Sequence, residues 1–326
     1  MSQGLAALSI DLDELRFYAA IHGLGADSGV VDGAVYRLAV PRLRRLLDEL
    51  QIRATFFVVG ADIARESSTL AQLVADGHEL GNHSFDHHYD LTRRPRLEIH
   101  EQIATTGAAL EAVSGARPVG FRAPGYRVTD ELFDVLLAQG YRYDSSVFPS
   151  PPYFLAKAAA IGAHRLFGRV SRSVQDDPRL LLAPADPYRV GNPYWRRGRG
   201  LLELPIGVTR GIRAPYIGTS LALAGRPLGL LLTWAITRRP LVNLELHGID
   251  FLDRRDAGLG PLASMQPDLR VARPRKERAL RSAVDRLQRA GYRFVRLIEA
   301  AEAFVDGRPS AATRARQAGP FEQPLP

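Results

Sequence analysis

The sequence predicts an α/β protein built on a parallel sheet, and two observations support that fold class. Short apolar runs rich in β-forming residues alternate with amphipathic stretches of helical periodicity, several of which end at a glycine. Polar residues follow directly after these apolar runs, where parallel strands would end. The alternation fits an open parallel sheet or one that closes into a barrel.

The predicted elements follow one another through most of the chain. We expect strands within 5–11, 53–60, 78–83, 118–125, 141–146, 201–207, 241–248 and 292–297. We expect helices within 36–50, 68–77, 94–115, 129–140, 221–236 and 273–291, and the apolar helix 221–236 is expected to be buried. A membrane-facing patch is the alternative interpretation of 221–236.

Two segments depart from this alternation. Residues 147–200 are rich in Pro, Tyr, Trp and Arg, which predicts an irregular insertion over one face within a single domain covering 1–305. The segment 306–326 is rich in Pro, Arg and small residues, a composition typical of a disordered tail.

Composition limits the chemistry of any site. The chain has 326 residues, of which 46% are apolar, so it can bury a substantial core. It has no cysteine, which excludes disulfides and thiolate-bound metals. Any metal ion must therefore be held by His, Asp or Glu side chains.

The formal charge of +8 does not indicate a nucleic-acid partner. Two of the 43 basic residues are lysines, Lys157 and Lys276, so 43 − 2 = 41 are arginines. This bias is typical of codon composition, and no stacking platform or basic helical stripe accompanies it. Contact with an anionic membrane surface or a phosphate-bearing substrate stays open.

The apolar runs favour a cytoplasmic location and no transmembrane segment. The N-terminal run is ended by Asp11, and the longest later run, 228–236, is shorter than the roughly 18 residues that a spanning helix needs. The sequence does not indicate an oligomeric state.

Four side chains at predicted strand ends could hold or assist a metal ion. His83 and His87 are four residues apart, so both imidazoles face one way if the segment turns helically. Asp11 and Asp13 stand at i and i+2 after the first strand. Two His and one carboxylate are typical of a hydrolytic metal site, whereas a surface turn and a helix cap are the alternatives.

The motifs SIDLD (9–13), HELGNHSFDHH (78–88), GFRAPGYR (120–127) and LELHGID (244–250) together resemble the polysaccharide deacetylase family with the NodB homology domain, a carbohydrate esterase type. The resemblance covers about residues 5–300. It implies an irregular seven-stranded (β/α) barrel, similar to a TIM barrel, and a divalent metal ion, most often Zn²⁺. Members remove N-acetyl groups from amino sugars.

The resemblance also implies roles for individual residues. Asp13, His83 and His87 would hold the metal, Asp11 would be the general base, and Arg122 would orient Asp11. The backbone N–H groups near Gly125 and Tyr126 would stabilise the oxyanion, and His247 would protonate the leaving amine. Asp250 would orient His247, and Trp195 is a candidate sugar platform.

One departure indicates the branch. Leu12 separates Asp11 from Asp13, whereas the common motif has adjacent aspartates. That variant resembles the cytoplasmic branch of peptidoglycan-deacetylase-like and allantoinase-like proteins.

The sequence therefore predicts a metal-dependent hydrolase acting on a carbon–nitrogen bond of an N-acetylated amino sugar, in a glycan or in a nucleotide- or lipid-linked precursor. One alternative is a deformylase of a formamido sugar or another non-peptide amidohydrolase. A non-catalytic carbohydrate-binding protein is the alternative of another class. Asp86 and His88 are expected to shape the turn around His87, and Glu203 is either a structural acid or a pocket residue.

Overall fold

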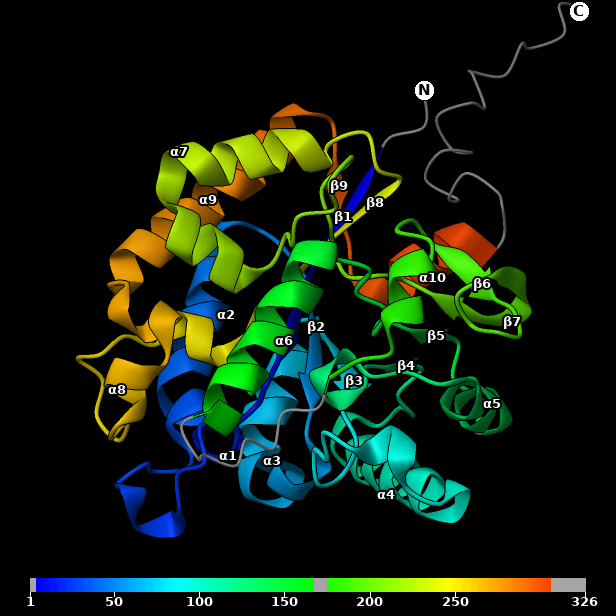
Figure 1. Ribbon diagram of the computed structural model, residues 1–326, viewed down its shortest axis with the longest axis horizontal. Coiled ribbons are helices and arrows are strands. Elements are labelled where there is room, and N and C mark those ends of the chain that lie inside the picture. Colours follow the sequence, from blue (N-terminus) through cyan, green and yellow to red (C-terminus); the bar gives the residue numbers. More distant parts are fainter. Residues whose placement is uncertain (1–3, 167–174, 306–326) are drawn as a thin grey trace, which may run out of the picture.

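The centre of the protein is a curled, mostly parallel sheet (Figure 1). The computed structural model describes residues 4–166 and 175–305. Within them, seven parallel strands follow the order β7-β5-β4-β3-β2-β1-β8; β6 adds an antiparallel edge to β7, and β9 pairs with the start of β1. The strands are β1 Leu5–Asp11, β2 Thr55–Val58, β3 Glu79–Asn82, β4 Gly120–Phe121, β5 Tyr143–Asp144, β6 Tyr188–Val190, β7 Arg197–Glu203, β8 Leu241–His247 and β9 Arg293–Phe294.

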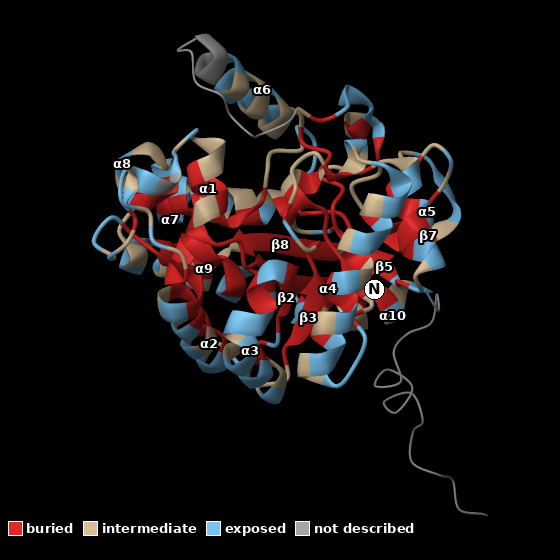
Figure 2. Ribbon diagram, turned by 90° about the horizontal axis from the view of Figure 1, so that it is seen from below, coloured by how far each residue is buried: buried red, intermediate tan, exposed pale blue. Residues whose placement is uncertain are grey.

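Helices surround this sheet, and Figure 2 shows that the buried residues gather on the strands and on the helix faces turned toward them. The helices are α1 Leu15–Ile21, α2 Val40–Glu49, α3 Gly60–Ala75, α4 Arg96–Ser114, α5 Asp130–Ala138, α6 Pro151–Leu166, α7 Gly218–Ile236, α8 Leu262–Met265, α9 Arg273–Arg289 and α10 Leu297–Val305. Two short helical turns, η4 (Pro124–Tyr126) and η6 (Gly248–Phe251), follow β4 and β8.

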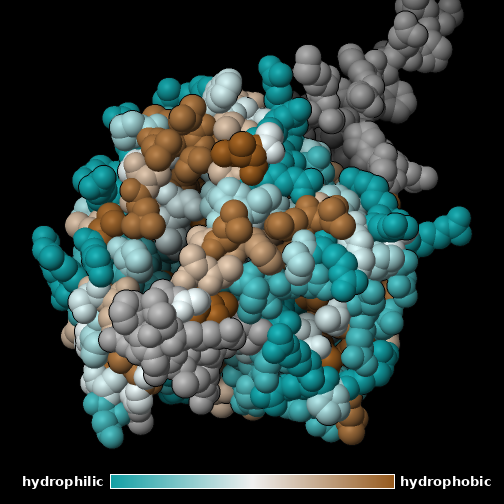
Figure 3. Space-filling view, viewed as in Figure 1, coloured by the Kyte–Doolittle hydropathy of each residue, from teal (hydrophilic) through white to brown (hydrophobic). Residues whose placement is uncertain are grey.

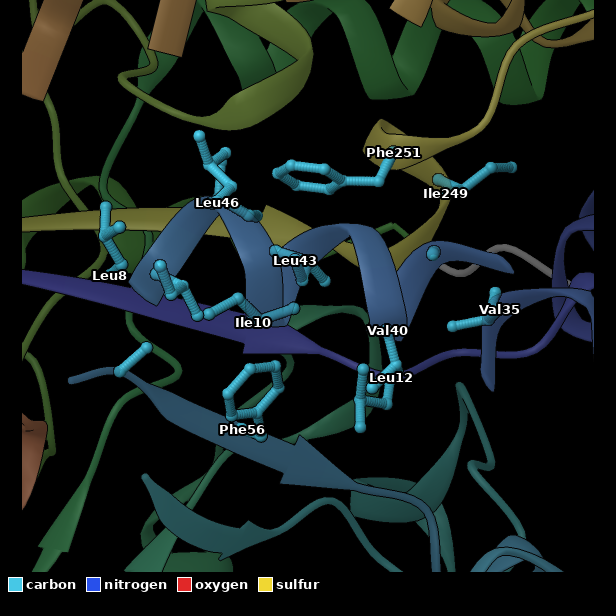
Figure 4. Close-up of a cluster of buried hydrophobic side chains, with 14 of the residues drawn as sticks. Leu8, Ile10, Leu12, Val35, Val40, Leu43, Leu46, Phe56, Ile249 and Phe251 are labelled. Carbon is cyan, nitrogen blue, oxygen red and sulfur yellow. The ribbon is translucent and has the colours of Figure 1, made fainter. Parts of the chain in front are cut away.

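The main hydrophobic core lies between β1 and α2. Every residue of β1 is buried, which explains why its sequence, LAALSID, begins with four apolar residues in a row instead of alternating. Leu8 and Ile10 of β1 lie near Leu43 and Leu46 of α2 (Figure 4). This packing holds the carboxyl end of β1, where the chemically useful residues begin, in a fixed position.

The expected seven-stranded barrel is only partly present. The parallel sheet curls, but the strand pairing ends at β8 on one side and at β6 on the other, so strand pairing does not close a barrel. The chain after β7 spans this gap: Gly207 N donates to Asn243 O of β8 at 2.8 Å, and Ile217 pairs with Glu245 in a single parallel bridge. Loop backbone thus takes the place of a closing strand.

The segment 147–200 is more regular than the irregular insertion that the sequence suggested. It contains α6, β6 and the first residues of β7, because Pro and Tyr at its borders mark element ends rather than a continuous loop. Lys157 of α6 donates to Gly125 O outside the segment at 3.1 Å and to Asp176 Oδ2 within it at 2.9 Å, so it links the segment to the turn after β4. The predicted tail 306–326 lies outside the described residues.

Candidate active site

The carboxyl ends of neighbouring strands bring distant parts of the chain together. Asp11 ends β1 and is in register with His247, which ends β8. His83 follows directly after β3, and Arg122 follows directly after β4, which pairs with β3. The sheet therefore places these four side chains at one edge, as expected for a parallel α/β site.

The three candidate metal ligands converge. Asp13 Oδ1 lies 3.3 Å from His83 Nε2, and Asp13 Oδ2 lies 3.2 Å from His87 Nε2. The two Nε2 atoms are 3.2 Å apart, and all three side chains are buried. Although burial raises the pKa of Asp13, the imidazoles of His87 and His83 outweigh it and hold that pKa well below its usual range. Asp13 is therefore a carboxylate.

The orientation of His83 leaves Nε2 free to bind. Its Nδ1 lies 2.7 Å from the carbonyl oxygen of Arg122, and because a carbonyl only accepts, Nδ1 carries the proton. A ligating histidine commonly donates its other ring nitrogen in this way, which fixes the tautomer. The Nε2 lone pair then points toward Asp13 and His87.

The turn that presents His87 is held from two sides. Ser84 and His87 have positive φ of 61° and 53°, so this backbone is strained relative to an ordinary helix. Asn82 Oδ1 accepts from Ser84 N at 2.8 Å. From α4, Gln102 Oε1 accepts from the backbone of Phe85 and Asp86, and Gln102 Nε2 donates to Asp86 Oδ2 at 2.7 Å.

These contacts show that Asp86 holds the turn in shape rather than facing Asp13. Gln102 was missed from the sequence, because nothing in a helix 16 residues away indicates that it reaches back to this turn. His88 is half-buried and lies 3.5 Å from Asp86 Oδ2 through Nε2, outside the convergent group.

The donor set fits a divalent metal ion. Two imidazole Nε2 atoms and a carboxylate lie within 4.8 Å of one another, and two neutral imidazoles with one carboxylate are a common set for Zn²⁺. Burial lowers the pKa of His87, which favours the neutral, ligating form. Asp13 Oδ1 is buried without a hydrogen-bond partner among the described residues, as expected of an atom placed to bind a cation.

Asp11 and Arg122 form a buried ion pair beside this group. Arg122 Nη1 donates to Asp11 Oδ1 at 2.7 Å, and the rest of the guanidinium is bound by Ser9 Oγ, Ser145 O and Ser145 Oγ. Arg122 is fully buried, with its guanidinium 4.3 Å from the centroid of the Phe57 ring. Asp11 Oδ2 is left unbonded, and it faces His83 Nε2 at 3.9 Å and His247 Nε2 at 4.0 Å.

His247 is oriented by Glu245, a residue that the sequence interpretation missed. Glu245 Oε1 lies 2.8 Å from His247 Nδ1, and both side chains share a face because they are two residues apart on β8. Burial lowers the pKa of His247, but Glu245, Asp11 and Asp13 outweigh it and raise that pKa well above its usual value. These carboxylates therefore favour the protonated form of His247.

Asp250 contacts His247 through the cap of η6. Its Oδ2 accepts from the backbone N of His247 at 2.9 Å, and its own backbone N–H donates to the His247 side chain. Burial and then the nearby Asp268 raise the pKa of Asp250 to about 7. The Asp250 carboxylate positions the backbone of His247, whereas the Glu245 carboxylate contacts the ring.

The predicted oxyanion groups are also arranged differently. Tyr126 N donates to Ala123 O at 3.0 Å within η4, so this N–H is already used. Gly125 and Tyr126 both have positive φ, and this turn directs the Tyr126 hydroxyl to within 3.3 Å of His247 Nε2. The Tyr126 side chain, not its backbone, faces the site.

A pocket of about 290 Å³ begins beside the site, and Trp195 lies in its wall together with Tyr126, Tyr194 and Arg179. The Arg179 guanidinium lies 5.3 Å from the centroid of the Trp195 ring. Tyr126 lines this pocket and its hydroxyl lies 3.3 Å from His247 Nε2, so the pocket adjoins the candidate catalytic residues. Glu203 is fully buried and accepts from Val147 N at 3.0 Å, a structural contact.

The chain is similar to known deacetylases over part of its length. Residues 28–143 match the model of the family described as Polysaccharide deacetylase. A peptidoglycan deacetylase of Helicobacter pylori is 26% identical over 159 residues, which are 46% of this chain and 53% of that protein. A chitooligosaccharide deacetylase of Bradyrhizobium is 31% identical over 110 residues, 33% of this chain and 50% of that protein.

The fold is also similar to a solved structure. A protein from Mycobacterium smegmatis, described as a candidate polysaccharide deacetylase, superposes with a TM-score of 0.55 at 18% identity, covering 100% of this chain and 96% of that one. At this identity the likeness concerns the fold alone. The chain spans about half the length of the two relatives that it matches in sequence.

Proposed function

We propose that the chain is a metal-dependent hydrolase that removes the N-acetyl group of an amino sugar, and the match of residues 28–143 to the polysaccharide deacetylase family supports this proposal. One observation carries the proposal: the Asp13, His83 and His87 group lies between the Asp11–Arg122 pair and the Glu245–His247 pair. Amide hydrolysis needs a polarised carbonyl, a base for water and an acid for the leaving amine. The candidate metal ligands would serve the polarised carbonyl, Asp11 would be the base and His247 would be the acid.

Asp13, His83 and His87 would hold the metal ion. When bound, a divalent ion supplies Lewis acidity that polarises the amide carbonyl and makes water more acidic. The burial of all three donors excludes competing bulk water from this part of the site.

Asp11 is the proposed general base. Its Oδ1 is occupied by Arg122, so Oδ2 alone is free to take a proton from the attacking water. The charge-assisted bond to Arg122 keeps Asp11 in one orientation, which is a requirement for proton transfer over hydrogen-bond distance.

His247 is the proposed general acid. The imidazolium, held by Glu245 through Nδ1, presents Nε2 toward the site and gives its proton to the sugar nitrogen as the carbon–nitrogen bond breaks. Tyr126 lies 3.3 Å from the same Nε2 through its hydroxyl, and it supports the leaving side of the substrate.

An amino-sugar polymer or oligomer is the proposed substrate class. The relatives named above are a peptidoglycan deacetylase and a chitooligosaccharide deacetylase, and the pocket beside Tyr126 offers Trp195 and Tyr194 as apolar surfaces for sugar rings. The substrate of this chain is to be identified by the product assay described next.

A product assay tests the proposal. Purified full chain, supplied with Zn²⁺, is incubated with N-acetylated chitooligosaccharides, with peptidoglycan fragments and with a formamido sugar, and free acetate and formate are measured. Acetate release that disappears in Asp11→Asn supports the proposal. Formate alone identifies a deformylase, and binding of the sugars without release of either acid identifies a carbohydrate-binding protein. Cell fractionation tests the predicted cytoplasmic location.

A further inference from the structure

Helix α7 exposes large apolar side chains instead of being the buried helix that its sequence suggested. Leu223, Leu228, Leu231 and Trp234 are 50%, 50%, 55% and 61% exposed. Among the described residues, α7 is the one helix whose length and apolar composition would suit a membrane span, and only 33% of its most apolar window is buried. The core helix of a soluble protein can be equally long and apolar, but it would be mostly buried.

The geometry of α7 does not suit a straight helix that crosses a membrane. Gly225 interrupts the helix with φ 65° and ψ −174°, and Pro227 follows. The two halves lie along the surface beside α9 (Figure 1). One face of α7, with Leu221, Gly229 and Thr233, is buried, while the opposite face points to solvent. This is the arrangement of an amphipathic helix that lies flat on an interface.

Two neighbouring loops extend the exposed face. Arg210 N donates to Ala235 O at the end of α7 at 3.0 Å, which brings Ile212, 75% exposed, to this side. Arg213 Nη1 donates to Leu181 O at 2.9 Å and to Ala183 O at 3.2 Å, so Leu182, 68% exposed, lies next to that loop.

We call these six side chains the apolar surface: Leu182, Ile212, Leu223, Leu228, Leu231 and Trp234. Figure 3 shows apolar side chains gathered over α7 on the face turned to the viewer. A cluster of this kind is uncommon on a monomeric protein without a binding role.

Basic side chains predominate around the apolar surface. Between Glu203 and Glu245 the sequence contains five arginines and no acidic residue. Arg210, Arg226 and Arg238 are exposed, and no ion pair joins any of them to an acidic side chain in the described part of the chain, whereas the nearby Asp186 is paired with Arg239. The apolar surface is therefore accompanied by arginines whose charge is not neutralised by an ion pair.

We propose that the apolar surface docks on an anionic lipid bilayer as a peripheral contact. Leucine side chains and an exposed tryptophan are suited to the boundary between acyl chains and headgroups, and the arginines are suited to anionic headgroups. A second copy of the chain fits less well, because a twofold interface would bring the same arginines against one another.

The docked helix is connected to the proposed catalytic site. α7 begins at Gly218, Thr219 Oγ1 lies 3.5 Å from Asp250 Oδ1, and Ile217 pairs with Glu245. Docking through α7 would hold the site close to the bilayer. The docking inference itself does not depend on the proposed function, since it rests on exposed side chains and charge alone.

Vesicle sedimentation of the full chain tests this inference. We expect binding to vesicles of phosphatidylglycerol and phosphatidylcholine in equal amounts and weak binding to phosphatidylcholine alone. Added salt should decrease the binding to the anionic vesicles.

Leu228→Gln with Leu231→Gln should weaken binding at least tenfold. Arg210→Gln, Arg226→Gln and Arg238→Gln together should weaken it by roughly fivefold per arginine. The control Leu97→Gln with Leu137→Gln removes equally exposed leucines of α4 and α5 and should leave binding unchanged.

Fluorescence gives a second readout that needs no disruption of the surface. Trp195→Phe leaves Trp234 as the single tryptophan, and its emission should shift to shorter wavelength on anionic vesicles. Absence of sedimentation and of this shift would overturn the inference. Concentration-dependent dimerisation that Leu228→Gln with Leu231→Gln abolishes, without vesicle binding, would also overturn it and assign the surface to a second copy.

Discussion

Glu245 Oε1 lies 2.8 Å from Nδ1 of His247, and both residues project from the same face of β8. Burial alone would lower the pKa of His247, but Glu245, Asp11 and Asp13 raise it beside the candidate metal ligands. Glu245 thus contacts the ring from the strand that precedes the histidine, and Asp250 contacts His247 from the cap that follows it.

We predict that Glu245→Gln shifts the alkaline limit of activity to lower pH. A general acid works below its pKa, and activity falls as pH rises through that pKa. Removal of the Glu245 charge lowers the pKa of His247, so the fall begins earlier, and kcat at neutral pH drops by roughly 10²-fold. A pH–kcat profile checks this. An unchanged alkaline limb would show that Glu245 does not control His247.

Arg122→Lys should lower kcat by at least about tenfold while bound metal is retained. A lysine ammonium cannot contact Asp11, Ser9 and Ser145 together as the guanidinium does. Arg122→Ala should in addition destabilise the fold by roughly 3–5 kcal/mol, because Asp11 would be buried without its partner. Denaturant unfolding measures the second effect, and equal activity in Arg122→Lys would contradict the orienting role.

Gln102→Ala should lower metal affinity by roughly tenfold, although Gln102 is not a ligand. Its side chain holds the backbone of Phe85 and Asp86 and so fixes the turn that presents His87. Gln139→Ala is the matched control, since Gln139 links α5 to His100 O far from this turn. Isothermal titration with Zn²⁺ compares the variants, and equal affinities would remove Gln102 from the site.

Asp250→Asn should flatten the pH dependence of stability between about pH 4 and 7. Burial and then the nearby Asp268 raise the pKa of Asp250 in the folded protein to about 7, from the usual aspartate value of 3.8. Protonated Asp250 therefore contributes to the unfolding free energy in full below its pKa in the unfolded chain, and this contribution is lost as pH rises through its pKa in the folded protein. The loss is roughly 1.4 kcal/mol per pH unit, or a few kcal/mol in all. Unfolding free energies at several pH values test this, and an unchanged slope would argue against a buried neutral carboxyl.

Much of the strand framework could be predicted from the sequence. β1 and β8 can be predicted because short runs rich in apolar residues end at Asp11 and His247, which fall in register at the same sheet edge. Asp13, His83 and His87 could be grouped through the resemblance of their motifs to the polysaccharide deacetylase family, whereas the spacing of His83 and His87 alone left a surface turn as the alternative. Their convergence needed parallel strands in one curled sheet, because β2 lies between β1 and β3.

Other features depend on tertiary contacts that a local pattern does not contain. The position of Glu245, two residues before His247 on the same strand face, could have indicated a contact with the histidine, but such a position is equally typical of an ordinary strand residue. No local pattern indicates the role of Gln102, because it reaches the His87 turn from α4. The exposure of α7 was not foreseen because an apolar helix looks the same in sequence whether one face or both are covered. The barrel was expected to close, but residues 204–217 replace a closing strand with loop backbone.

Metal content tests the central claim most directly. We expect purified full chain dialysed against Zn²⁺ to retain about one ion per chain, and His83→Gln and His87→Gln to lose it together with amide hydrolysis, whereas His88→Gln keeps both. Inductively coupled plasma mass spectrometry gives the stoichiometry. Equal metal content and activity in wild type, His83→Gln and His87→Gln would contradict the account.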